Sequence, residues 1–269
     1  MKKLMAALLA AAATMVMSFT ALASEDPAVV FDRVTAKCSA MDSMDTHMDM
    51  NMALYPASMT GEKLDISMAV NMQTARLQSG NPVYKMETAA VLEGETEFST
   101  TFYKDGMYYM ENSGLKIKYP MDAASMMQSA KSANAASNMT SSMMKSITLE
   151  EVNGQRVLSY VADAGQMNAY ATQVMGAVMG QTGNGAVMNI REVSGTYVLT
   201  ADDYYSQMTM NMVMDMTYQG ETVVISIVMN GTLNHPGQPV EVVIPSTDGY
   251  QDMAAYLAEM MAAQSSPAA

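Results

Sequence analysis

The sequence of 269 residues contains one cysteine, no tryptophan and two histidines, and only 15% of its residues are charged. With Cys38 as the lone cysteine no intramolecular disulfide can form, so burial of a core must provide the stability, and we expect Cys38 to be a small buried hydrophobe. Lys and Arg number 14 against 27 Asp and Glu, giving a net charge of −13. This balance argues against a nucleic-acid binder, which needs basic patches, and against charge-driven docking on an anionic membrane.

Motifs of common enzyme classes are absent as well. The sequence has no G-x-S-x-G, H-E-x-x-H, P-loop or C-x-x-C pattern. His47 and His235 have no partner that the sequence identifies, and the pair Asp202 and Asp203 is expected to form a solvated turn. The sequence therefore predicts no catalytic residue, no metal site and no cofactor, and an enzyme is the least supported class.

Residues 1–23 have the pattern of a secretory signal peptide. Lys2 and Lys3 precede an apolar stretch that ends in Ala-Leu-Ala before Ser24. An uncleaved membrane anchor is the alternative, but the small-residue site favours cleavage, and no later apolar run is long enough to span a membrane. No lipobox precedes Cys38. We therefore expect a secreted or extracytoplasmic protein with no transmembrane segment after cleavage.

Methionine is the abundant residue, with 34 copies, many at alternate positions. The run at 208–216 places five methionines on one side, and the run at 42–54 alternates in the same way. Such alternation predicts half-buried antiparallel strands with one apolar and one wet face. We expect further strands at 63–74, 83–92, 95–104, 107–111, 115–119, 147–151, 155–162, 186–193, 196–200, 223–233 and 240–244.

Helical spacing of apolar residues occurs at far fewer places. We predict helices over 27–41, within the Ala- and Ser-rich stretch 120–145, after the N-cap Asp163, and over 250–261. These helices are too few for repeated βαβ units. The sequence therefore predicts an α+β fold with a curved antiparallel sheet and helices on one face. We expect a single domain over 24–262 and a disordered tail at 263–269.

The methionine-lined strand faces allow three interpretations. Methionine is flexible and specifies packing poorly, so a face lined with it suits a variable apolar partner. An ordinary filled core would show the same alternation. Thioethers also bind Cu(I), but His47 would point away from Met48, Met50 and Met52. Same-side neighbours along a strand lie about 6.6–6.8 Å apart, so copper ligands would have to converge from adjacent strands.

Several segments together resemble a known family. The alternating strands at 47–54 and 208–216, the hairpin at 102–110 and the closing Val-Val-Ile-Pro at 242–245 resemble a methionine-rich, uncharacterised family of envelope proteins in Gram-positive bacteria. That family is similar in fold to the LolA/LppX group of lipoprotein and lipid carriers. The resemblance implies a LolA/LppX-like half-open barrel, with helices on the concave face and an apolar cavity that holds acyl chains. It implies no catalytic residues.

The sequence thus favours a binding protein that holds a lipid or other hydrophobic small molecule in a methionine-lined cavity. The alternatives are a structural or interaction protein with a filled core, which binds an envelope protein partner, and an extracytoplasmic Cu(I) binder. The predicted lining residues are Met48, Met50, Met52, Met68, Met72, Phe98, Phe102, Met210, Met212 and Met214.

Overall fold

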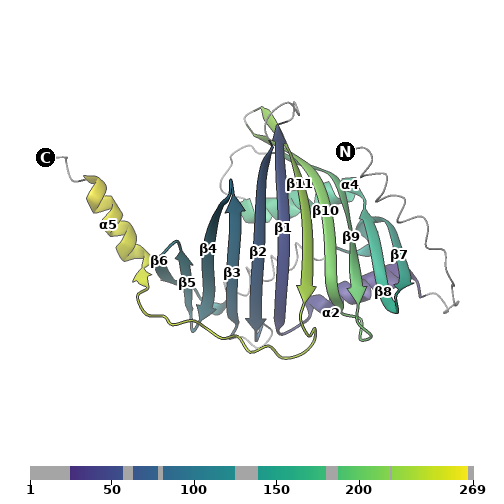
Figure 1. The fold of residues 1–269 in the computed structure, drawn as a ribbon, viewed down its shortest axis with the longest axis horizontal. Helices are drawn as coiled ribbons and strands as arrows, with labels where there is room; N and C mark the ends of the chain where they lie inside the picture. Colours follow the sequence, from purple (N-terminus) through teal and green to yellow (C-terminus); the bar gives the residue numbers. More distant parts are fainter. Residues whose placement is uncertain are drawn as a thin grey trace.

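The computed structural model describes residues 25–56, 63–77, 81–124, 139–179, 187–218 and 220–265. The predicted signal peptide, most of the predicted helical stretch at 120–145 and the last part of the predicted tail lie outside the described residues. Twelve strands form one sheet in the order β12-β6-β5-β4-β3-β2-β1-β11-β10-β9-β8-β7. The sheet is open and curved, and its neighbouring strands are antiparallel except for β12, which runs parallel to β6 (Figure 1).

Most strands follow the predicted alternation. In chain order they are β1 (Met44–Pro56), β2 (Leu64–Ala75), β3 (Val83–Leu92), β4 (Glu95–Lys104), β5 (Met107–Asn112), β6 (Leu115–Pro120), β7 (Met144–Val152), β8 (Gln155–Ala162), β9 (Val187–Leu199), β10 (Tyr205–Tyr218), β11 (Glu221–Leu233) and β12 (Gln251–Asp252).

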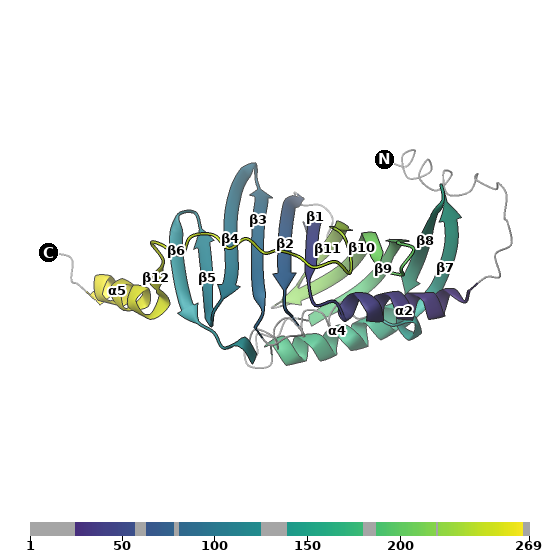
Figure 2. The same cartoon turned by 90° about the horizontal axis from the view of Figure 1, so that it is seen from below.

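The helices are α2 (Pro27–Ser39), α4 (Ala164–Met179) and α5 (Met253–Ser265), with a short 3-10 turn η1 (Ser141–Met143). Asp163 caps α4 as predicted, because its carboxylate accepts a hydrogen bond from the Gln166 backbone N–H at 2.9 Å. α2 and α4 lie on the same face of the sheet (Figure 2). α5 contacts β6 and β12 at the sheet edge and projects away from the body (Figure 1), so the expectation that all helices cover one face is wrong for α5.

The main core lies between α2 and the β8–β9 part of the sheet. α2 buries Val30, Phe31, Val34 and Cys38, the stripe that its apolar spacing predicts. Phe31 is fully buried, and its ring meets the Tyr160 ring edge-on with 5.7 Å between centroids. This packing fixes α2 against the sheet and confirms that Cys38 is a buried thiol.

Two strand predictions are wrong. The predicted strands at 186–193 and 196–200 are one continuous strand, β9, in which Gly195 lies under the Tyr160 ring and leaves room for it. The segment 240–244 is extended but joins no ladder, because it crosses the ends of the strands instead of running beside them (Figure 2). β12 was not predicted, since two residues carry no periodicity.

Candidate functional site

The register of the sheet brings methionines from four strands into one transverse row. Met50 on β1 lies directly opposite Met68 on β2 and, on its other side, opposite Met229 on β11. Met229 in turn lies opposite Met210 on β10. Directly opposed residues point to the same face and hold their Cβ atoms about 4.5–5.5 Å apart. We call Met68, Met50, Met229 and Met210 the methionine row.

The same register places all eight predicted methionines on one face of the sheet. This methionine face comprises Met48, Met50, Met52, Met68, Met72, Met210, Met212 and Met214, and each of these residues is half-buried. It is the face against which α2 and α4 pack.

The methionine face has two parts. At one end, Met210, Met212 and Met214 pack against the core under the helices. For the two helices on this face, the principal contacts with the sheet are those of α4 with β9 and of α2 with β7. The predicted methionines of β1 and β2 lie on the same face outside this core cluster, and α4 runs across that face as far as these two strands (Figures 1 and 2).

The two predicted phenylalanines do not belong to the methionine face. β4 pairs with β3 so that Ala90 lies opposite Glu97 and Ala89 lies opposite Phe98. Ala90 shares the methionine face through its pairing with Met68, so Glu97 points to that face and Phe98 and Phe102 to the other. The two-residue turn at Glu93 and Gly94 fixes this register, and it overrides the expectation that the apolar side of β4 points the same way as the methionines.

Phe102 and Phe98 have different environments on this second face. Phe102 is fully buried, stacked on Tyr109 at 4.5 Å and edge-on to Tyr250 at 5.6 Å. Burial, together with the charge and the hydrogen bond of Glu111, raises the pKa of Tyr250 to about 12. The cluster therefore fastens the C-terminal segment to the sheet. Phe98, in contrast, is 67% exposed.

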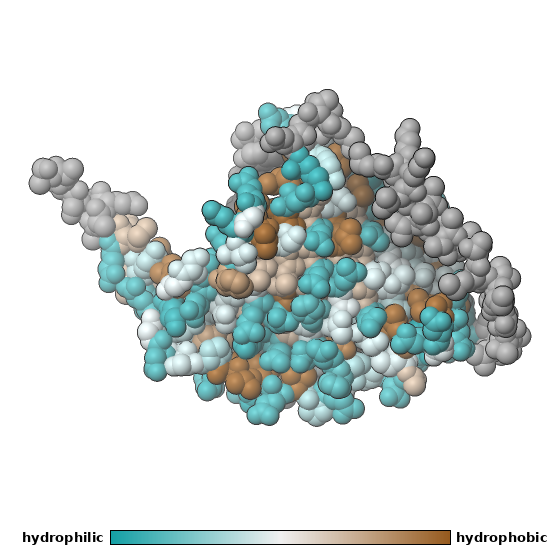
Figure 3. Space-filling view, viewed as in Figure 1, coloured by the Kyte–Doolittle hydropathy of each residue, from teal (hydrophilic) through white to brown (hydrophobic). Residues whose placement is uncertain are grey.

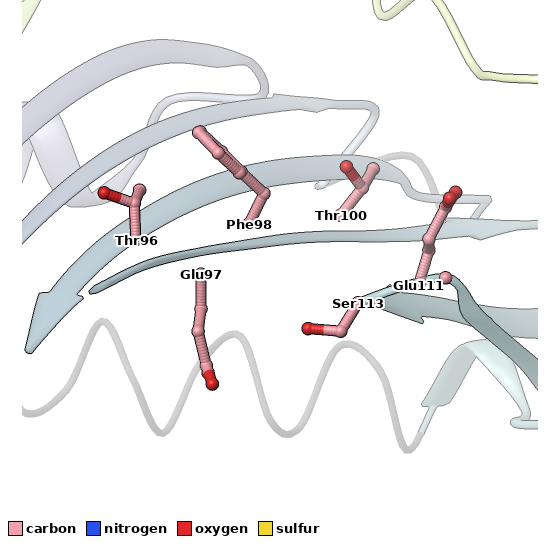
Figure 4. Close-up of a pocket in the computed structure, with 7 residues that line it drawn as sticks. Thr96, Glu97, Phe98, Thr100, Glu111 and Ser113 are labelled. Carbon is pink, nitrogen blue, oxygen red and sulfur yellow. The ribbon is translucent and has the colours of Figure 1, made fainter.

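A shallow depression of about 370 Å³ lies beside Phe98. Thr96, Glu97, Phe98 and Thr100 of β4 line it together with Glu111, Ser113 and Gly114 of the β5–β6 hairpin. Thr96, Phe98, Thr100 and Glu111 point to one side of the sheet and Glu97 to the other, as the pairing register requires (Figure 4).

The face opposite the helices is mostly hydrophilic, with scattered apolar patches (Figure 3). His47 points to this polar face, where its Nδ1 lies 2.7 Å from the Asn71 amide oxygen and its Nε2 lies 3.3 Å from the Asp49 carboxylate. The Asn71 contact, with help from Asp49, raises the pKa of His47. Among the described residues, no three His, Cys, Asp or Glu side chains group as metal ligands do.

An ion-pair network at the start of α2 was missed by the sequence analysis. Asp203, which was expected to be solvated, lies between Arg33 at 2.9 Å and Arg156 at 2.6 Å, and Glu25 bridges the same two guanidinium groups. Partial burial raises the pKa of Asp203, but the Arg156 hydrogen bond and charge outweigh it and the pKa is lowered. The network ties α2 to the β9–β10 turn, and no local pattern could reveal it because its members are far apart in sequence.

No described helix is both long and apolar enough to cross a bilayer. The chain is similar to several solved structures, among them the following three. LprF from Mycobacterium bovis is 13% identical, with 83% of this chain and 98% of that chain covered and a TM-score of 0.42. A DUF1329 family protein from Desulfovibrio piger is 8% identical, with 78% of this chain and 95% of that chain covered and a TM-score of 0.27. A LolA superfamily protein from Nitrosomonas europaea is 7% identical, with 82% of this chain and 96% of that chain covered and a TM-score of 0.21.

No curated protein sequence matches the chain. A family model does match, over residues 26–247, which include every strand from β1 to β11 and end before β12 and α5. The chain therefore belongs to the family of unknown function DUF6612.

Proposed function

We propose that the protein is an extracytoplasmic binding protein that holds a lipid acyl chain, or another hydrophobic small molecule, against the methionine face. The observation that carries this proposal is the register, which gathers eight half-buried methionines from three strands on one face. The ligand would lie over β1 and β2, on the concave side of the sheet, beside α4. A signal peptide at residues 1–23 would direct the chain out of the cytoplasm.

Burial of apolar area supplies the binding free energy in this proposal. A ligand that removes some 300 Å² of apolar surface from water gains about 7.5 kcal/mol at about 25 cal/mol per Å² before the costs of binding are subtracted. Methionine side chains adjust to ligands of different shape more easily than branched side chains do. The face therefore suits a class of apolar ligands better than one rigid molecule.

Native mass spectrometry of residues 24–269, purified without detergent, tests the proposal. We expect an adduct of several hundred daltons that dissociates on denaturation. Met50→Asp with Met68→Asp places two carboxylates at directly opposed positions of the methionine row and should abolish the adduct. Asn51→Asp with Ser67→Asp is the matched control. These exposed residues form the directly opposed pair next to Met50 and Met68, but their side chains point to the polar face.

The site is wrong if the folded Met50–Met68 variant carries as much ligand as the control variant. Substitution of Met210 and Met212 is a poorer test, since both residues also pack against the core and their loss would destabilise the fold. If the aspartate pair does not fold, Met50→Gln with Met68→Gln introduces polarity with nearly unchanged side-chain length. Thermal unfolding of each variant shows which of them remain folded.

The methionine row also favours a second candidate function, the binding of Cu(I). Copper ligands would have to converge from adjacent strands, and Met50 is flanked on both sides by directly opposed methionines, Met68 and Met229. Thioethers select Cu(I) over harder cations. His47 would take no part, because it points to the opposite face.

Leucine substitutions separate the two candidates. Met50→Leu with Met229→Leu preserves apolar volume but removes two thioethers, so it should leave lipid loading intact and abolish retention of Cu(I) against bicinchoninate. Met52→Leu with Met212→Leu, outside the row, is the matched control. If the parent protein retains no Cu(I) under this competition, the copper candidate is eliminated and the apolar-ligand proposal is unaffected.

A further inference from the structure

One strand edge inside the sheet lacks a neighbour over part of its length. β3 pairs with β4 from Leu92–Glu95 onward, whereas the ladder between β4 and β5 begins only at Ser99–Asn112. Residues 95–98 of β4 therefore extend beyond the tip of the β5–β6 hairpin (Figure 1). Among the described residues, these four have a strand partner on one side only. At about 3.4 Å per residue, the open edge is about 14 Å long.

Hairpin geometry shows which backbone groups face the opening. The turns at 93–94 and 105–106 each contain two residues with positive φ, so the residues that flank each turn form a hydrogen-bonded pair. Backbone groups then alternate in direction along the strand. Those of Glu95 and Glu97 point to β3, and those of Thr96 and Phe98 point to the open side. An incoming strand would find the donors and acceptors of Thr96 and Phe98 at this edge.

The side chains at this edge have two different characters on the two faces. Phe98 is 67% exposed on the outer face and borders the depression of about 370 Å³ (Figure 4). Glu95 and Glu97 project on the other face. The chain from residue 86 to residue 103 contains no Lys or Arg, so nothing within that stretch neutralises the carboxylates. Charged residues commonly protect strand edges from self-pairing, but an exposed aromatic side chain at such an edge does not serve that purpose.

We propose that the open edge of β4 binds an extended peptide in which basic and apolar residues alternate, and that the peptide adds a strand to the sheet beside residues 95–98. Directly opposed residues share a face, so a basic residue opposite Glu97 and an apolar residue near Phe98 are the complementary choice. Backbone hydrogen bonds to Thr96 and Phe98 give the added strand its direction and affinity. A second copy of this chain is the poorer partner, because its own net charge is −13 and its β4 edge carries the same carboxylates.

The probe for this site is a fluorescein-labelled hexapeptide of alternating lysine and leucine, measured by fluorescence anisotropy with the full mature chain. We expect Phe98→Ser and Glu97→Lys each to weaken binding at least tenfold. Val152→Ser, at a 42% exposed valine near another hairpin turn, and Glu221→Lys, at an exposed hairpin glutamate, are the matched controls and should bind like the parent. Thr96→Pro removes one N–H from the open edge without removing one from the β3 ladder, so it should weaken binding as well.

Strand addition is distinguished from simple attraction by a second probe. A hexapeptide of the same sequence with N-methyl groups on alternate amides cannot complete a ladder, so it should bind at least tenfold more weakly. Equal binding of the two peptides, or equal weakening by Glu97→Lys and Glu221→Lys, would overturn the proposal in favour of non-specific charge attraction. A concentration-dependent dimer that Thr96→Pro abolishes would overturn it in favour of a second copy. Phe98→Ser should leave ligand loading on the methionine face unchanged. A negative result for the peptide site would therefore not count against the ligand-binding proposal, and the reverse also holds.

Discussion

Replacing Phe31 with alanine tests whether α2 and the sheet form a tightly packed core beside the β10 end of the methionine face. The Phe31 ring is fully buried against the stacked rings of Tyr160 and Tyr197, at centroid distances of 5.7 and 5.9 Å. A buried Phe→Ala substitution costs about 3–5 kcal/mol, and each lost aromatic pair accounts for about 0.5–1.5 kcal/mol. We expect the free energy of unfolding to fall by about 4 kcal/mol. At about 2–4 °C per kcal/mol, Tm should fall by about 8–16 °C.

Urea-induced unfolding, followed by circular dichroism, measures this loss if the m-value is unchanged. Phe98→Ala is the matched control, since the same atoms are removed from a ring that is 67% exposed. That variant should change the free energy of unfolding by less than about 0.5 kcal/mol. A loss below about 1 kcal/mol for Phe31→Ala, or equal losses for both variants, would refute the burial of Phe31 under the helix.

Three further predictions concern the same core. Gly195→Ala should lower the free energy of unfolding in urea by about 1–3 kcal/mol. The added Cβ would overlap the Thr209 carbonyl oxygen and lie 2.6 Å from the Tyr160 hydroxyl. An unchanged urea midpoint would contradict this close approach. Cys38, whose thiol pKa burial raises to about 11, should react with a disulfide reagent only in denaturant, and rapid reaction of the folded protein would show that it is accessible. Burial also raises the pKa of Tyr205 to about 12, so the folded state keeps a phenolic proton that the unfolded state loses near pH 10. Stability should therefore fall between pH 10 and 12, and equal urea midpoints at pH 9 and 11 would argue against a buried phenol.

Period-two alternation was sufficient to find most of the sheet. In β1 and β10 the methionines alternate with Asp, Asn and Thr, so the sequence alone showed which residues share a face within each strand. It could not show which residues lie side by side on neighbouring strands. The opposition of Met50 to Met68 and Met229 depends on loop lengths and strand order, which bring together residues as much as 179 positions apart. The methionine row was therefore visible only in the structure.

The error at Phe98 and Phe102 has a local physical cause. The prediction assumed that the apolar side of every strand points to a common core. In the β3–β4 hairpin, the two-residue turn makes Leu92 and Glu95 directly opposed, so Glu95 and Glu97 must share the face of Leu92. The signal was present in the sequence as Leu-Glu-Gly-Glu at 92–95, and turn geometry outweighed hydrophobic patterning at this exposed hairpin.

The methionines of this face are less buried than the residues of the main core. Phe31, Leu158 and Val193 under the helices are 2% exposed or less, whereas all eight predicted methionines retain intermediate exposure. A rigid core would favour branched side chains that pack in few rotamers. A methionine at a half-buried position loses less packing when its surroundings change, because its flexible side chain can repack against a different neighbour. A sheet face lined with half-buried methionines is consistent with exchange between a bare and a loaded state.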